Sequence, residues 1–499
     1  MTAGQSDWLQ ARVAATPEAP AVVFGDQTLS YATLDARARR LANNLNALGV
    51  RPGEVVAALL ENGLEWPVLL WALRIQGGVL LPLNARLTAH ELVHPLRDAR
   101  VRVLLHADGR LGETARMAAA GADPVVTGAL DALGDLRLEA PLSSPFDGPD
   151  SERLRGAMAL LYTSGTTGSP KGVVLGPEAF RSSAESAQAL LGADETDRWL
   201  VCMPLFHVGG LSILIRSGLA GGAAVIHPSF DAEHVSRALE ERAITQLSLV
   251  ANMLDRILAV RGRRPAPSSL RCVLLGGGPT PPDLIDRALE LGWPIAPTYG
   301  LTETASQVAT RPPGVPGRRP ETSLWALPGT QLRVVDDRGR DQPVGQAGEI
   351  WVSGPTLMRG YLSLPQVNQK VLCEGWLHTG DMGQLDGEGR LTVLDRREDL
   401  IVSGGENIYP AEIEAALLRH PEVAEAGVVG VPDPQFGARP VAYWVAVEPD
   451  RHAPDLNAHC RSLLAGFKIP VAFYRCSVLP RSPSGKLLRR DLSPLSKAE

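Results

Sequence analysis

A stretch of hydroxyl and glycine residues closed by one lysine, residues 162–173, is suited to binding phosphate. It follows the apolar run 157–161, which predicts a buried strand leading into the loop. Glycines let backbone N–H groups approach phosphate oxygens, and a lysine adds positive charge. A surface turn is the alternative, and the Walker pattern does not fit, because Gly172 follows the lysine. The candidate phosphate-binding residues are Thr163, Ser164, Gly165, Thr166, Thr167, Gly168 and Lys171.

A second motif, residues 299–303, combines an aromatic ring, a glycine, a hydroxyl and a carboxylate in what we expect to be one turn after a buried strand. Mg²⁺ takes oxygen ligands and keeps several waters, so Glu303 beside nucleotide phosphates is a candidate ligand. An exposed glutamate in an ordinary turn is the alternative. Tyr299, Gly300 and Thr302 are candidate nucleotide-binding residues of the same motif.

Three motifs nearer the C-terminus carry further candidates. Asp381 follows Thr-Gly, which predicts a turn whose carboxylate accepts from ribose hydroxyls or merely orders its own turn. Arg396, in a charge cluster, is a candidate contact to ribose or phosphate, with a solvated linker arginine as the alternative. The pair Gly404 and Gly405 predicts a tight turn that permits close backbone approach. Lys486 lies in a turn-rich loop.

These motifs need a scaffold of alternating strands and helices. Apolar periodicity predicts a helix that begins after Ser30 and ends at Gly49, and buried strands at 55–60, 199–203, 223–226, 246–250 and 271–275. Such alternation predicts α/β layers with parallel strands. The pattern weakens between 108 and 156, where we expect a loosely structured connection. Gly277 and Gly278 follow the strand 271–275, at the edge where open α/β sheets bind ligands.

The fold class expected is α/β, with a large N-terminal domain of layered subdomains and a small, mobile α+β C-terminal domain. Frequent turns beyond residue 312 predict a β-rich, antiparallel subdomain at about 313–394. The charge cluster 395–399 suggests the boundary, giving domains 1–395 and 396–499. The length of 499 residues is too great for a single core.

Charge and cysteine content exclude several classes of function. The net charge of −6 provides no basic field for nucleic acid, so none is expected as a partner. Five scattered cysteines and no signal-peptide pattern suggest a reducing cytoplasm. The segment 208–226 is apolar but contains Arg216, which predicts protein interior rather than a membrane span. A homo-oligomer is left open.

Taken in order, the motifs at 162–173, 299–303, 375–381, 395–414 and 480–488 resemble those of the adenylate-forming superfamily of acyl-CoA synthetases, luciferases and peptide-synthetase adenylation domains. This resemblance covers essentially the whole chain. It implies ATP, Mg²⁺ and coenzyme A, with Lys486 acting in adenylation and the Gly404–Gly405 face in thioester formation. The hinge position, commonly Asp or Lys in the family, is Glu398 here.

The segments 197–200, 204–212, 274–279 and 403–412 resemble o-succinylbenzoate–CoA ligases of menaquinone synthesis. The resemblance implies a small carboxylic acid substrate. Arg216 is a candidate partner for its second carboxylate or ketone, although pairing with a protein carboxylate is equally open. His207 is a candidate for gating the acyl pocket or favouring thiolate attack, or is a packed core residue.

Other readings of the same motifs are a different aryl- or fatty-acyl-CoA synthetase, a free-standing amino-acid-activating enzyme, or a silent nucleotide sensor. Amino-acid-activating domains generally carry an Asp in the segment that here reads 205–211, which has none. Intact Lys171, Glu303 and Lys486 disfavour the sensor.

Overall fold

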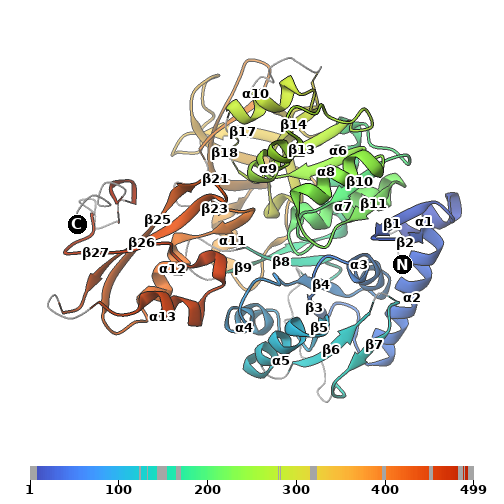
Figure 1. The fold of residues 1–499 in the computed structure, drawn as a ribbon, viewed down its shortest axis with the longest axis horizontal. Helices are drawn as coiled ribbons and strands as arrows, with labels where there is room; N and C mark the ends of the chain where they lie inside the picture. Colours follow the sequence, from blue (N-terminus) through green and yellow to red (C-terminus); the bar gives the residue numbers. More distant parts are fainter. Residues whose placement is uncertain are drawn as a thin grey trace. The chain divides into compact units, whose positions relative to one another are not determined.

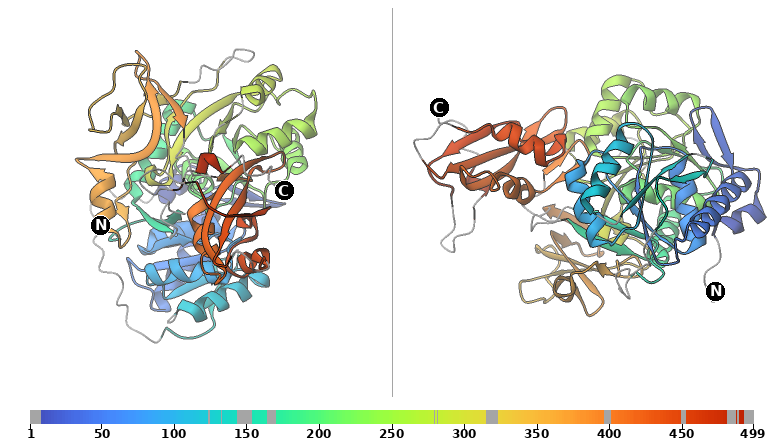
Figure 2. Two further views of the ribbon diagram at one scale, coloured as in Figure 1. Left: turned by 90° about the vertical axis from the view of Figure 1, so that its left-hand side faces the viewer. Right: turned by 90° about the horizontal axis from the view of Figure 1, so that it is seen from below.

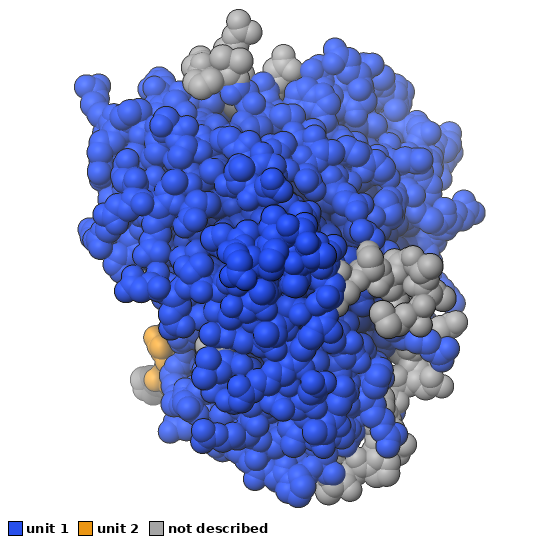
Figure 3. Space-filling view, turned by 90° about the vertical axis from the view of Figure 1, so that its right-hand side faces the viewer, with its two compact units in different colours: residues 1–85, 96–161, 172–394 blue, residues 86–95, 162–171, 395–499 orange. Residues whose placement is uncertain are grey.

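The computed structural model describes residues 8–122, 125–131, 133–142, 154–163, 170–278, 280, 282–314, 323–395, 401–448, 453–480, 487 and 489–492. The chain divides into two compact units (Figure 3). Unit 1 comprises Met1–Ala85, Leu96–Leu161 and Gly172–Leu394. Unit 2 comprises Asp395–Glu499 together with the short segments Arg86–Pro95 and Tyr162–Lys171.

Sheet I, the largest sheet in the described chain, has nine strands (Figure 1). The strands from β14 to β1 pair in parallel, and antiparallel strands flank them on both sides. The alternation of apolar strands and helices predicted this arrangement, which is confirmed. Its strand order is β16 (Trp325–Ala326), β15 (Ser306–Thr310), β14 (Ile295–Leu301), β13 (Cys272–Leu275), β12 (Gln246–Leu249), β10 (Arg198–Val201), β11 (Ala223–Ile226), β1 (Pro20–Phe24) and β2 (Gln27–Ser30).

Sheet II contains eight of the described strands. Its central strands β3, β4 and β5 are parallel and fully buried, as apolar runs of this kind require. Strand β8 ends in the phosphate-loop motif, so the predicted strand before that loop is confirmed. The order is β19 (Gly360–Tyr361), β9 (Lys171–Leu175), β8 (Ala159–Thr163), β4 (Val79–Pro82), β3 (Val55–Leu59), β5 (Val103–His106), β6 (Val126–Leu130) and β7 (Leu136–Leu138).

Helices of unit 1 cover the sheets. Figures 1 and 2 show α8, α9 and α10 together beside sheet I, and α5 beside sheet II. Ser30 caps α2 by accepting from the Thr33 N–H at 3.2 Å, which confirms the predicted helix start. The helices of unit 1 are α1 (Trp8–Ala15), α2 (Tyr31–Ala47), α3 (Glu65–Gln76), α5 (Arg110–Ala122), α6 (Pro177–Leu191), α7 (Val208–Ala220), α8 (Ala232–Glu241), α9 (Ala251–Arg261), α10 (Pro282–Glu290) and α11 (Pro365–Val371). Most of helix α4 (Ala89–Asp98) belongs to unit 2.

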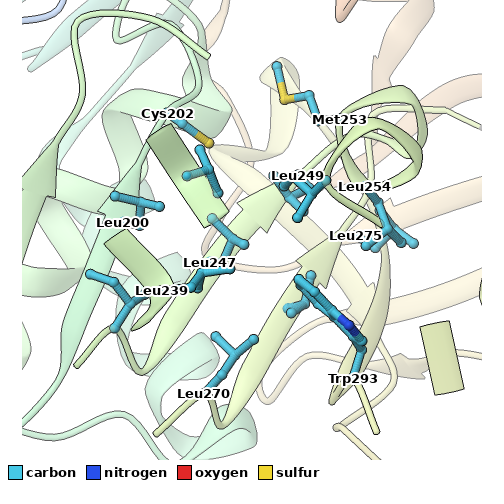
Figure 4. Close-up of a cluster of buried hydrophobic side chains, with 14 of the residues drawn as sticks. Leu200, Cys202, Leu239, Leu247, Leu249, Met253, Leu254, Leu270, Leu275 and Trp293 are labelled. Carbon is cyan, nitrogen blue, oxygen red and sulfur yellow. The ribbon is translucent and has the colours of Figure 1, made fainter. Parts of the chain in front are cut away.

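A core of leucines joins sheet I to this helical layer (Figure 4). Leu247 and Leu249 on β12 pack in one cluster with Leu239 of α8 and Leu254 of α9, and Trp293 closes it near β14. Full burial of each such side chain contributes about 1.5–3 kcal/mol. This packing holds the carboxyl ends of the parallel strands in place.

The expectation of a loosely structured connection between 108 and 156 is wrong for its first part. Residues 110–122 form α5, and β6 and β7 follow it. Apart from Leu111, the buried face of α5 is made of small residues, Gly112, Ala115, Ala118, Ala119 and Ala122. These alanines have helical spacing but little hydrophobic area, so their pattern is weak beside the surrounding Gly, Asp and Pro residues.

Sheet III confirms the antiparallel region expected beyond residue 312. Its strands are β17 (Gln331–Val335), β18 (Gly348–Ser353), β21 (Trp376–Leu385) and β20 (Leu372–Cys373), with β22 (Leu391–Asp395) beside β21. Unit 2 contains sheet IV, a mixed sheet with two helices, which is an α+β arrangement. It is formed by β24 (Glu406–Ile408), β23 (Ile401–Ser403), β26 (Gly437–Ala446) and β25 (Val423–Asp433), with β27 (Phe473–Cys476) beside β26, α12 (Pro410–Leu417) and α13 (Leu456–Leu463).

The apolar segment 208–226 forms α7 and β11, and both are largely buried in unit 1. The prediction of protein interior for this segment is confirmed. In the part of the chain that was searched, no helix combines the length and the apolar character needed to cross a membrane.

Candidate active site

A buried tyrosine–aspartate pair joins sheet I to sheet III. The hydroxyl of Tyr299 donates a hydrogen bond to Oδ2 of Asp381 at 2.7 Å, and both residues are buried. Among the described residues, Oδ1 of Asp381 accepts no hydrogen bond. The Asp381 carboxylate is therefore fixed through one of its two oxygens, Oδ2.

The expected Thr-Gly turn before Asp381 is wrong, because these residues lie inside strand β21. Gly380 has a φ of 73°, and the pairing with β18 shifts register between Glu349 and Trp351. The Gly380 N–H donates to the Glu349 carboxylate at 2.8 Å, and the Asp381 N–H to the Thr379 hydroxyl at 3.0 Å. This is a β-bulge, which uses the same residue types as a turn and re-aims a side chain.

The motif 299–303 also differs from the expected turn. Tyr299 and Gly300 lie within strand β14, and Thr302 and Glu303 begin the short 3₁₀ helix Thr302–Thr304 that follows it. A Cβ at Gly300 would lie 1.7 Å from the Ser306 carbonyl oxygen, so this position admits only glycine. The close approach folds β15 back on β14 and brings Ser306 beside the motif.

Glu303 is held by a distant tyrosine. Its Oε1 accepts from the Tyr361 hydroxyl at 2.7 Å, and its carbonyl oxygen accepts from the Met358 N–H at 2.8 Å. No described residue hydrogen-bonds Oε2. The described residues contain no group of three or more His, Cys, Asp or Glu side chains that could hold a metal. A single oriented carboxylate fits Mg²⁺ that takes its remaining ligands from phosphates and water.

Arg216, in the middle of α7, is a buried cation whose protein partners are all neutral among the described residues. One guanidinium nitrogen donates to the Ser306 hydroxyl at 3.0 Å, and the group lies 5.5 Å from the centroid of the Trp199 ring. Its Nε is buried without a hydrogen-bond partner. Burial lowers its pKa to about 10. Pairing with a protein carboxylate, one of the two expectations, is not found within the described chain.

Ser306, the partner of Arg216, has an unusual backbone. Its φ is 109°, and Ala305 before it has a φ of 51°. For residues other than glycine such values cost on the order of 1–3 kcal/mol and cluster at binding sites. The Ser183 hydroxyl donates to the Ala305 carbonyl at 2.9 Å and helps to hold this conformation.

The remaining described candidates of unit 1 lie at a helix start and at a strand end. His207 is the N-cap residue of α7, and its ring packs edge-on against Phe206 at 4.7 Å between centroids. Gly277, with a φ of 85°, and Gly278 follow β13, as expected for the ligand-binding edge. A Cβ at neighbouring Gly276 would lie 2.7 Å from a Thr298 side-chain carbon, so this loop passes directly beside the strand that carries Tyr299.

In unit 2, Gly404 and Gly405 have φ values of 57° and 88° and join β23 to β24. The expected tight turn is therefore confirmed. Thr163 ends β8 and Lys171 begins β9. The other predicted residues, Ser164, Gly165, Thr166, Thr167, Gly168, Arg396, Glu398 and Lys486, lie outside the described residues.

Sequence reasoning missed three residues of this site: Trp199, Ser306 and Tyr361. Trp199 lies in the segment 197–200, and Ser306 follows the 299–303 motif by three residues. Their nearness to these motifs is the sequence signal that could have identified them. Tyr361 is 58 residues from Glu303 along the chain and has no such signal.

Two models of protein families match this chain. The model for the AMP-binding enzyme matches residues 9–362, and the model for the AMP-binding enzyme C-terminal domain matches residues 412–486. The chain belongs to the AMP-binding enzyme family. The resemblance to the adenylate-forming superfamily is thus confirmed, as is the α/β class with a large N-terminal and a small C-terminal domain.

Other AMP-binding enzymes match over nearly the full length. A 2-succinylbenzoate–CoA ligase of Bacillus cereus is 40% identical over 489 residues, 98% of each chain, and one of Bacillus licheniformis is 39% identical over 491 residues, 97% of this chain and 99% of the relative. The solved o-succinylbenzoate–CoA synthetase of Bacillus subtilis, as a double mutant with a product analogue, is 38% identical with a TM-score of 0.86 over 98% of each chain. An amide bond synthetase of Marinactinospora thermotolerans is 28% identical, with a TM-score of 0.84 over 97% of this chain and 98% of the other.

Proposed function

We propose that this AMP-binding enzyme is an ATP- and Mg²⁺-dependent 2-succinylbenzoate–CoA ligase. In the first half-reaction a substrate carboxylate oxygen attacks the α-phosphorus of ATP, and pyrophosphate leaves with the electrons of the broken P–O bond. In the second, the thiol sulfur of coenzyme A attacks the acyl carbon, the bond from that carbon to the phosphate oxygen breaks, AMP leaves with its electrons, and the thiol proton passes to solvent. The relatives named as such ligases, and the Bacillus subtilis synthetase solved with magnesium and ATP, support this reaction.

The observation that carries the substrate assignment is the buried Arg216 with only neutral partners among the described residues. A buried charge is costly unless it is paired. o-Succinylbenzoate has two carboxylates, so one reacts with ATP while the other remains available to pair with a guanidinium. A fatty acid or benzoate has one carboxylate and would leave Arg216 without a charged partner.

The nucleotide side of the reaction uses the two oriented carboxylates. Asp381, held by Tyr299, binds a ribose hydroxyl through its second oxygen. Glu303, held by Tyr361, is the protein ligand of Mg²⁺, which when bound neutralises phosphate charge. Tyr299, Gly300, Thr302, Gly277 and Gly278 shape the surrounding strand ends. Because these groups are fixed before the substrate binds, the protein contributes positioning and electrostatic stabilisation.

The remaining assignments belong to the same proposal and rest on the motifs. Lys171 and the loop 163–168 hold the departing phosphates, Arg396 contacts the ribose or phosphate, and Lys486 contacts the reacting carboxylate and α-phosphate. Glu398 is the hinge position. In thioester formation the Gly404–Gly405 turn replaces Lys486 beside the reaction centre.

A carboxylic-acid panel tests the proposal. Pyrophosphate release and CoA consumption are measured with o-succinylbenzoate, benzoate and a medium-chain fatty acid, each with ATP and Mg²⁺. Turnover is expected with o-succinylbenzoate above the other two acids. Turnover with fatty acids only would overturn the substrate while leaving the acid–CoA ligase class in place.

We also propose that the enzyme works in the cytoplasm without nucleic acid. The net charge of −6 and the scattered cysteines support this. A filter-binding titration with DNA and RNA tests it, and salt-sensitive retention would count against it. Gel filtration with light scattering decides between a monomer and a homo-oligomer.

A further inference from the structure

Asn62, in the segment after β3, is buried and binds the backbone of two other segments of unit 1. Its Nδ2 donates to the Met203 carbonyl at 2.9 Å and to the His227 carbonyl at 3.2 Å. Its Oδ1 accepts from the Leu205 N–H at 2.9 Å. Two carbonyls face the nitrogen and one N–H faces the oxygen, so the network fixes the orientation of the amide. Both hydrogens of the amide are used.

The segment 203–207 that Asn62 binds leads directly into α7. Its end, His207, is the N-cap residue, and the His207 carbonyl accepts from the N–H groups of Gly210 and Leu211 at 3.1 and 2.9 Å. A Cβ at Gly210 would lie 2.2 Å from the Pro204 carbonyl oxygen. The segment therefore folds closely over the first helical turn, and a shift of its backbone must move His207.

The backbone beside Asn62 and at His227 is also held by hydrogen bonds. The Trp66 indole N–H donates to the Glu61 carbonyl at 2.9 Å, beside Asn62, and Trp66 is fully buried. The His227 N–H donates to the Val201 carbonyl at 2.9 Å, which ties the end of β11 to β10. Asn62 thus links two strand ends and the helix start through one side chain.

We propose that Asn62 is a positioning residue that fixes the segment 203–207 and thereby places His207 in the acyl pocket. The inference rests on the proposed function together with the role that the sequence suggests for His207, which is to gate the acyl pocket or to favour thiolate attack. A helix start that moves by about 1 Å can reduce the rate on the order of a hundredfold when it carries a group at the reaction centre. Asn62 acts through His207 and does not itself contact the substrate.

The test is a double-mutant cycle with Asn62→Asp and His207→Ala. Asn62→Asp keeps the shape and the acceptor for Leu205 but replaces both donors with an oxygen that faces two carbonyls. We expect kcat/KM for the acid to fall at least about tenfold in the wild-type background, and less than about twofold in the His207→Ala background, because residues that act together are not additive. The KM for ATP is expected to change less than about twofold. Equal losses in both backgrounds would overturn the inference.

Gln76→Glu is the matched control. Gln76 is also a buried carboxamide of unit 1, and its Nε2 donates to the Val50 carbonyl at 3.0 Å and to the Asn46 side chain at 3.3 Å, with no bond to the segment 203–207. The Gln76→Glu variant is expected to lower Tm as Asn62→Asp does, while its kcat/KM for the acid stays within about twofold of wild type. A comparable fall in kcat/KM for Gln76→Glu would show that stability, and not the position of His207, explains the loss.

Three further measurements keep the inference testable if Asn62→Asp folds poorly or if the proposed substrate is wrong. Gly210→Ala displaces the same segment from the other side and is expected to give the same dependence on His207. Wild-type turnover across the panel decides the proposed function first, and the acid that turns over is used in the cycle. The ring-proton NMR resonance of His207, assigned with His207→Ala, needs no substrate. It is expected to shift in Asn62→Asp and not in Gln76→Glu, and an unshifted resonance would overturn the inference.

Discussion

Replacement of Arg216 by methionine separates the cost of a buried charge from its use in binding. The side chain is 4% exposed, and its contacts are the Ser306 hydroxyl and the Trp199 ring. Methionine is shorter but occupies a similar volume, and it has no charge. We expect the variant to fold with nearly wild-type stability and to bind the acid substrate much more weakly.

The stability estimate follows from the pKa of the guanidinium. Burial lowers it from 12.5 to about 10, which corresponds to about 3 kcal/mol against the charged form. A depressed folded-state pKa favours folding with the neutral form, so at pH 7, below both values, this penalty applies in full. Methionine removes the penalty but loses a charged hydrogen bond of about 1.5–3 kcal/mol and a cation–π contact of about 0.5–2 kcal/mol. The net change is therefore expected to stay below about 2 kcal/mol.

The binding estimate is larger. Removal of one partner of a buried, hydrogen-bonded charge pair costs about 2–5 kcal/mol. At about 1.4 kcal/mol per factor of ten, the KM for o-succinylbenzoate should rise roughly thirtyfold to a few thousandfold. The KM for ATP should stay within about twofold, because Asp381 lies on β21 and Glu303 in the 3₁₀ helix after β14, and neither belongs to α7.

Lys468→Met provides the comparison. Lys468 is also buried, but it contacts the carboxylates of Glu91 and Glu412 in unit 2 at 2.8 and 2.7 Å. Burial by itself would lower its pKa, yet the two carboxylates outweigh burial and raise it. Its loss leaves two buried carboxylates uncompensated, so we expect a destabilisation of about 3–5 kcal/mol.

The assay combines urea unfolding at pH 7 with pyrophosphate-release kinetics at varied acid and varied ATP. A loss of stability in Arg216→Met as large as that in Lys468→Met would show that Arg216 has a structural charge partner. An unchanged KM for the acid would remove Arg216 from the acyl pocket. Either result refutes the reasoning.

Three further predictions follow from other contacts. Asp381→Asn should raise the KM for ATP about tenfold or more and leave the KM for the acid nearly unchanged, as steady-state kinetics would reveal. Burial raises the pKa of Tyr31 above its ordinary 10.0, so the stability that the neutral phenol provides is full below pH 10 and is lost at higher pH. Between pH 9 and pH 10.5 the urea midpoint should therefore fall more for wild type than for Tyr31→Phe, and equal falls would contradict this. Lys486→Ala should abolish adenylate formation but spare thioester formation from pre-made acyl-adenylate, whereas equal loss of both steps in single-turnover assays would argue against separate roles.

Local patterns predicted many of the elements because their causes are local. The Ser30 cap and the leucine spacing specify α2, and unbroken apolar runs specify strands such as β3 and β12. The motifs also indicated phosphate binding from the sequence, because glycines, hydroxyls and a lysine at fixed spacing are typical of few other functions. Helix α5 was missed because an alanine face buries little area and so leaves a weak periodic signal.

The turns expected at residues 299–303 and before Asp381 were wrong for a common physical reason. Turn and bulge both need a residue with positive φ beside a small polar side chain, so Thr379 and Gly380 fit either one. Only the neighbouring strand β18 decides, because the register shift between Glu349 and Trp351 leaves room for two extra residues on β21. The same holds for Gly300, whose necessity comes from the Ser306 carbonyl and not from a turn.

The sequence by itself determined the family, the order of the strands and helices that it recognised, and the chemical type of each candidate residue, since these depend on side chains close together in the chain. Only the tertiary structure decided the partners: Ser306 for Arg216, Tyr361 for Glu303 and Tyr299 for Asp381. These pairs are 90, 58 and 82 residues apart. A hydrogen bond depends on distance in space, and periodicity reports only whether a side chain is buried, so such partners leave no pattern in the sequence.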